Sequence, residues 1–156
     1  MNTKEIDALM RNTPAYRGTF SRDTIPDVTG LMIVNTDPSH LPGTHWIAIF
    51  IDPTRQRGEY FDSFGRPPDE HFNNFMNAHC SNWIYNKRQL QSVVSKYCGY
   101  YCVVYCLLRS AGKDLNGFIK IFSRDTGYND AMIKKCLRLI VCKQFSNNAM
   151  LSKFTR

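Results

Sequence analysis

The chain has 156 residues, of which 43% are hydrophobic and 13% aromatic. Such a length and composition provide one domain with a substantial core, which excludes a disordered or fibrous protein. The formal net charge is +7, which indicates either a polyanionic partner such as DNA or a solvated basic surface without a ligand. The basic residues concentrate at Arg55/Arg57, Lys87/Arg88, Lys134/Lys135/Arg138 and Lys153/Arg156.

Hydropathy and cysteine spacing indicate the compartment. No run of about 18 apolar residues occurs, and the opening MNTKEIDALM has no basic flank before an apolar block. We therefore expect a soluble, intracellular protein without a membrane span. Of six cysteines, Cys98, Cys102 and Cys106 lie four residues apart in one apolar segment, which predicts reduced thiols that pack on one helix face.

The periodicity of apolar residues predicts alternating helices and strands along the chain. In order, these are a helix over 3–11 capped by Thr3, a short strand within 16–26, strands over 31–34, 45–52 and 59–65, a helix over 67–78, a strand over 83–91, a helix over 98–109, a segment over 115–122, and an amphipathic basic helix over 128–141. The predicted fold class is α+β, with a mixed or antiparallel central sheet packed against a buried helix that begins at Cys98 and flanked by further helices. Residues 1–156 are expected to form a single, monomeric domain.

Cys98 is the candidate nucleophile. The segment QSVVSKYCGYYCVVYCLL is polar up to Cys98 and then almost entirely apolar, so this cysteine lies where a buried helix begins. The partial positive charge of a helix N-terminus stabilises a thiolate and lowers the pKa of a cysteine. A thiolate nucleophile also requires a base, a group that orients the base, and donors for an oxyanion.

His45 is the best candidate base, and Asp62 the group that orients it. His45 begins a predicted buried strand, and Trp46 follows it as an aromatic shield for an ion pair. If strands 45–52 and 59–65 pair antiparallel through the intervening turn, Asp62 lies near His45. Each residue taken alone also has a structural interpretation, because single histidines are often buried packing groups and an aspartate before glycine often forms a turn.

Gln91 is the candidate oxyanion donor. Its side-chain amide and the backbone N–H of Cys98 could together meet a tetrahedral oxyanion. A glutamine seven residues before a cysteine is a weak signal by itself.

Taken together, the motifs GTHW, DSFG and QSVVSKYCG resemble those of the adenain-like cysteine proteases, in the clan that includes the ubiquitin-like-protein proteases. In adenain the corresponding motifs are GVHW, an acidic residue before PFG, and QGPNSAACG. The 17-residue step from His45 to Asp62 and the seven-residue step from Gln91 to Cys98 look the same. Upstream, RGTFSRDTIP and IVNT resemble LGTYDKRFPG and IVNT, so the similarity covers about residues 16–110.

The resemblance implies a cysteine endopeptidase with Cys98 as nucleophile, His45 as base, Asp62 as its orienting group and Gln91 in the oxyanion hole. It further implies cleavage of viral precursor polypeptides, or those of a virus-like element, at small, Gly-containing sites in the nucleus or virion. No cofactor or metal is expected for the chemistry. The family also implies activation by DNA and by a short viral peptide, which Cys80 would bind through a disulfide.

Two features depart from the adenain pattern. The acidic residue is Asp62 where adenain has Glu, although Asp is usual in ubiquitin-like-protein proteases. The shorter C-terminal part has no alignable resemblance, so it does not support the peptide and DNA surfaces.

Three alternatives remain open. One is a deubiquitinating or deSUMOylating protease with the same site. Another is a basic nucleic-acid-binding protein with an inactive protease fold. The third is a zinc site at His71, His79 and Cys80, which lie close in sequence without an accompanying C-x2-C pair.

Overall fold

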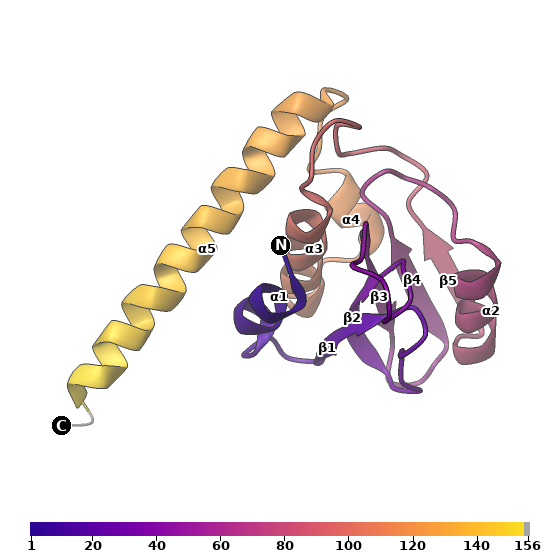
Figure 1. Ribbon diagram of the computed structural model, residues 1–156, viewed down its shortest axis with the longest axis horizontal. Coiled ribbons are helices and arrows are strands. Elements are labelled where there is room, and N and C mark those ends of the chain that lie inside the picture. The colour runs from indigo at the N-terminus through magenta and orange to yellow at the C-terminus, as the bar shows by residue number, and fades with distance from the viewer. Residues whose placement is uncertain (155–156) are drawn as a thin grey trace.

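The computed structural model describes the backbone of residues 1–154 and the side chains of residues 1–143 (Figure 1). Of the predicted basic tail, Arg156 and the side chain of Lys153 lie outside the described residues. The elements in order are α1 (Thr3–Met10), β1 (Tyr16–Ser21), β2 (Gly30–Asn35), β3 (Trp46–Ile51), β4 (Arg57–Phe61), α2 (Glu70–His79), β5 (Asn82–Tyr85), α3 (Cys98–Ser110), α4 (Leu115–Ile119) and α5 (Thr126–Phe154).

The five strands form one mixed sheet in the order β1-β2-β3-β4-β5. The three central strands β2, β3 and β4 pair antiparallel, whereas β1 and β5 join the two edges in parallel. The predicted α+β class with a mixed central sheet is therefore confirmed.

Helices cover both faces of this sheet, which is why its central strands are apolar on both sides. In β2, Leu31 and Ile33 join the hydrophobic cluster formed with α3, whereas Met32 and Val34 join the cluster formed with α2. This alternation follows from the two-residue period of a strand. Figure 1 shows α2 on one side of the sheet and α1, α3 and α5 on the other.

Helix α3 is the centre of the larger cluster and begins at Cys98, as predicted. Most of its first nine residues are buried, and Cys102 and Cys106 are fully buried thiols. The helix ends at Ser110, and Gly112 follows with a φ of 97°, a left-handed conformation that favours glycine at helix ends. The fold thus holds the start of α3 against the sheet.

Several boundaries differ from the prediction because polar side chains bind backbone groups. The N-cap of α1 is Asn2 rather than Thr3, since Asn2 Oδ1 accepts from the Glu5 N–H at 3.0 Å. Helix α2 begins at Glu70 because Asp69 caps it, accepting from the Phe72 N–H at 3.1 Å.

The two strands next to the predicted catalytic residues are shorter than expected. The strand predicted over 59–65 ends at Phe61, so Asp62 lies in the following loop. The strand predicted over 83–91 ends at Tyr85, because the Asn86 side chain bonds to the backbone of Asp62 rather than continuing the ladder.

The remaining differences concern the termini of the C-terminal helices. Helix α4 covers Leu115–Ile119 of the segment predicted over 115–122, and α5 extends beyond the predicted 128–141 in both directions. In the part of the chain that the structure describes, no helix has the length and apolarity needed to cross a membrane.

A buried ion pair joins β4 to α3. Glu59 is only 7% exposed, and its Oε2 accepts from the Tyr105 hydroxyl and from Arg109 Nε at 3.1 Å. The Arg109 guanidinium also lies 3.9 Å from the centroid of the Phe50 ring. Removing one partner of such a pair leaves the other charge buried without compensation.

Glu59→Ala is therefore expected to lower the free energy of unfolding by about 3 kcal/mol, as measured by urea denaturation. Glu59→Gln retains an oxygen for the Tyr105 hydroxyl and should lose less. An alanine variant within about 0.5 kcal/mol of the wild type would contradict a stabilising role for this pair.

Candidate active site

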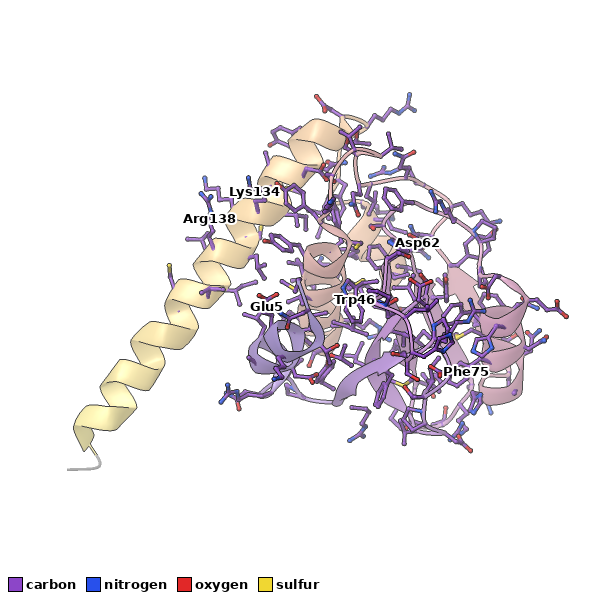
Figure 2. The ribbon with its side chains drawn as sticks, in the orientation of Figure 1. Glu5, Trp46, Asp62, Phe75, Lys134 and Arg138 are labelled. Carbon is purple, nitrogen blue, oxygen red and sulfur yellow. The ribbon has the colours of Figure 1, made fainter. Side chains whose placement is uncertain are left out.

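The β3–β4 pairing brings His45 and Asp62 together. Ala48 pairs with Phe61, so the residue before β3 and the residue after β4 emerge at the same end of the sheet. His45 Nε2 donates to Asp62 Oδ1 at 2.8 Å, which is the contact expected from the hairpin. Figure 2 shows Asp62 together with Trp46, the first residue of β3, in the centre of the molecule beside α3.

Asp62 is fixed by further hydrogen bonds. It is 3% exposed, and its Oδ1 also accepts from the Phe64 N–H at 2.8 Å. Its own N–H donates to Asn86 Oδ1 at 2.9 Å. Because a carboxylate only accepts, the bond to Asp62 places a proton on Nε2 of His45 and leaves Nδ1 for another partner.

Cys98 is the residue that acts on this imidazole together with Asp62. Burial alone would raise the pKa of Cys98, but the proton and the charge of the His45 imidazole and the backbone N–H groups of Trp46 and Gly99 lower it overall. Burial likewise opposes the charged imidazole, but the bonds to Asp62 and Cys98 and their negative charges raise the pKa of His45 to about 9. Both shifts favour a thiolate–imidazolium pair at neutral pH.

Cys98 lies at the floor of a cleft of about 630 Å³. No side chain caps the N-terminus of α3, so the backbone donors of its first turn remain available to an anion. The cleft is lined by Met1, Gly43, Thr44, His45, Trp46, Phe64, Arg66, Gln91, Val93, Ser95, Lys96, Cys98 and Gly99.

Gln91 is fully buried, and its side chain is held at both ends. The Ser63 hydroxyl donates to Oε1 at 2.7 Å, and Nε2 donates to the Ser95 carbonyl at 2.9 Å. An amide nitrogen carries two N–H groups. Gln91 is among the residues that line the cleft, and the bond to Ser95 uses only one of these two N–H groups.

The loop that carries Gln91 is anchored to helices α3 and α5. Asn129, at the start of α5, donates from Nδ2 to the Leu90 carbonyl at 3.1 Å. The Tyr101 hydroxyl of α3 lies 3.2 Å from the same oxygen and donates to Asp130 Oδ1 at 2.8 Å. The position of Gln91 therefore depends on residues about 40 positions further along the chain.

Gly65 allows the loop after β4 to approach the loop before α3. It has a φ of 68°, and a Cβ atom there would lie 2.5 Å from the backbone carbon of Arg88. The glycine of the DSFG motif thus has a steric cause, because any side chain would separate Asp62 from the loop that carries Gln91.

Sequence reasoning missed the residues that support the site. Asn86 holds Asp62, and Asn129 holds the Leu90 carbonyl. Gln91 is held by Ser63 and Ser95. None of these four supporting residues belongs to a pattern with a recognisable spacing. The periodicity predicts Phe64 only as part of the strand over 59–65, whereas in the structure the centroid of its ring lies 5.1 Å from that of the His45 ring.

The structure keeps Cys80 away from the cleft. It is the C-cap residue of α2, it is 7% exposed, and it packs in the hydrophobic cluster on the opposite side of the sheet from α3. Burial raises its pKa. Attachment of an activating peptide at Cys80 remains a prediction.

The histidines of the zinc alternative have other partners. His71 Nε2 is 2.7 Å from the Arg22 carbonyl, and His79 Nδ1 is 2.7 Å from the Phe75 carbonyl. Among the described residues, no group of three or more His, Cys, Asp or Glu side chains is arranged to hold a metal ion.

Comparisons with known proteins give structural neighbours only. No protein-family profile and no curated protein matches the chain. Among solved structures, the ASFV pS273R protease is 25% identical with a TM-score of 0.48, and the alignment covers 64% of this chain but only 40% of that one. The SUMO protease Ulp1 with its catalytic cysteine oxidized to a sulfinic acid is 17% identical with a TM-score of 0.43, covering 78% of this chain and 73% of that one.

A further structure of the SUMO protease Ulp1, with the cysteine oxidized to a sulfonic acid, is 16% identical with a TM-score of 0.42 and covers 76% of this chain and 72% of that one.

Selective alkylation tests the ion pair. Iodoacetamide should modify Cys98 of the wild type faster at pH 7 than a cysteine of ordinary pKa, because the pKa of Cys98 is lowered. In His45→Ala the contribution of the imidazole to the lowered pKa of Cys98 is lost while burial remains, so the rate at pH 7 should fall at least about 10-fold. Peptide mapping by mass spectrometry identifies the modified cysteine, and His71→Ala serves as the control. Equal rates in His45→Ala and the wild type would contradict the pair.

Proposed function

We propose that the chain is a cysteine endopeptidase. The observation that supports this most is that Cys98 and His45 line one cleft, that each shifts the pKa of the other, and that His45 is hydrogen-bonded to the buried Asp62. A nucleophile bonded to a base that is oriented by a buried carboxylate is the arrangement required for acyl transfer.

In the acylation step, the Cys98 thiolate attacks the carbonyl carbon of the scissile peptide bond, and a C–S bond forms. The carbonyl oxygen becomes an oxyanion that accepts from the Cys98 backbone N–H and the second N–H of Gln91 Nε2. His45, as imidazolium, gives its proton to the leaving nitrogen when the C–N bond breaks. The products are a thioester on Cys98 and a free amine.

In the deacylation step, neutral His45 accepts a proton from water, which attacks the thioester carbonyl. The C–S bond then breaks, and the carboxylic acid and the Cys98 thiolate are released. Asp62 stabilises each imidazolium that forms and keeps the ring in one tautomer.

The acylation step requires a protonated His45, whose pKa is raised to about 9. The rate of proteolysis, measured as a function of pH, should therefore decline above about pH 9, where His45 loses the proton needed by the leaving group.

The proposed substrates are precursor polypeptides of a virus or virus-like element, cleaved at small, Gly-containing sites. This part of the proposal rests on the resemblance of the three motifs to adenain-like proteases. The glycine beside Cys98 has a steric cause of its own, since a Cβ atom at Gly99 would lie 3.2 Å from Trp46 Cδ1 and 3.3 Å from Met1 Sδ.

Purified enzyme should cleave Gly-Gly peptides, and Cys98→Ala should reduce kcat/KM by at least about 1,000-fold. Mass spectrometry after rapid acid quenching should detect the acyl group on Cys98 of the wild type.

Ubiquitin-like fusion proteins assayed in parallel address the alternative of a deubiquitinating or deSUMOylating enzyme. Cleavage of fusions but not peptides would favour that alternative. Salt-sensitive DNA binding without peptide or fusion cleavage would favour an inactive nucleic-acid-binding protein.

Gln91→Ala separates stabilisation of the oxyanion from formation of the thiolate. Loss of one oxyanion donor should lower kcat by about 100- to 1,000-fold. The rate of Cys98 alkylation at pH 7 should stay close to that of the wild type, since Gln91 makes no hydrogen bond to Cys98 or His45 among the described residues. Alkylation slowed as much as catalysis would show that Gln91 supports the fold of the cleft instead.

A further inference from the structure

Apart from the Cys98 nucleophile, the ionisable side chains that line the cleft are all cationic when charged. Besides His45, they are Arg66 from the loop after β4 and Lys96 from the loop before α3. No aspartate or glutamate is among the described residues that line it. Two separate loops therefore each place a cation at the entrance to Cys98.

Arg66 is held in place by aromatic contacts. Its guanidinium carbon lies 4.8 Å from the centroid of the Phe64 ring, and that ring lies 5.1 Å from the ring of His45. This stacking positions the cation close to the catalytic histidine without neutralising it. Both Arg66 and Lys96 are exposed, and neither forms an ion pair with a described residue.

Two carboxylates that bond to residues of the lining have several hydrogen-bond partners or lie outside the lining themselves. Asp62 accepts from His45 and from the Phe64 N–H, and it is buried behind the histidine. Asp37 accepts from the Thr44 hydroxyl at 2.7 Å but is not itself part of the lining. The charge available to a bound molecule on the side of Arg66 and Lys96 is therefore positive.

From this arrangement we infer that Arg66 and Lys96 select substrates with an acidic side chain in the segment that occupies the cleft. This inference rests on the proposed function and specifies its substrate class. A substrate Asp or Glu beside the scissile bond gains a charge pair with either cation, and a negatively charged segment is attracted to the cleft before it binds. Exposed pairs of this kind change a rate by about 2- to 5-fold each.

The first test measures the charge of the cleft without requiring catalysis. Iodoacetate and iodoacetamide alkylate the same thiolate, so the ratio of their rates at Cys98 cancels changes in the nucleophile and reports attraction of the anion. The ratio should fall about 2- to 5-fold in Arg66→Gln and in Lys96→Gln, and further in the double variant. Added salt at 1 M, where the screening length is about 3 Å, should remove most of the difference.

Lys113→Gln is the matched control, because it removes one exposed cation at the other end of α3. Helix α3 has 13 residues, so this position is about 20 Å from Cys98. The alkylation ratio of this variant should equal that of the wild type.

The second test uses pairs of Gly-Gly peptides in which one flanking residue, on either side in turn, is Asp or Asn. For at least one position, the wild type should cleave the Asp peptide faster, and Arg66→Gln with Lys96→Gln should remove the preference. An unchanged alkylation ratio in the double variant, or equal cleavage of every Asp and Asn pair, would overturn the inference. If the ratio falls but the wild type cleaves no peptide or fusion protein, the cleft attracts anions and the proposed proteolysis is what fails.

Discussion

The electrostatic interaction between the Cys98 thiol and the His45 imidazole is the one on which the rest of the site depends. Both groups are largely buried, and burial opposes the charge on each. The pair is stable as ions only because each charge compensates the other and because Asp62 and backbone N–H groups add further bonds. A small set of fixed contacts thus offsets the cost of burying the two charges. The loss of any one of these contacts would change the reactivity of the Cys98 sulfur.

The fold supplies these contacts from elements that are far apart in sequence. The end of β4 provides Asp62, the start of β3 provides His45, and the first turn of α3 provides the sulfur. The loop from Asn86 to Tyr97 connects them, since Asn86 binds the backbone of Asp62 and Gln91 accepts from Ser63. The sheet and α3 set the distances between His45, Asp62 and Cys98, while the loop sets the orientation of the Asp62 and Gln91 side chains.

The sequence predicted the fold class and the central elements because their patterns are local. The apolar run after Cys98, the dense strand after His45 and the hairpin turn each appear within about a dozen residues. The predicted strands extend beyond the ends of β4 and β5 in the structure. Both strands end early because Asn86 bonds to Asp62, 24 positions away, and no local pattern in the sequence indicates this contact. Ser63 and Asn129 were missed for the same reason, since a lone serine or asparagine has no periodicity that marks it as a partner of Gln91 or Leu90.

The anchoring of the Leu90 carbonyl by Asn129 has a mechanical consequence. The base of α5 and the peptide unit next to Gln91 share this hydrogen bond, so a shift in the first turn of α5 would strain the Leu90 carbonyl. Helix α5 continues well beyond the sheet (Figure 1), so its outer turns are connected to that carbonyl through one continuous helix.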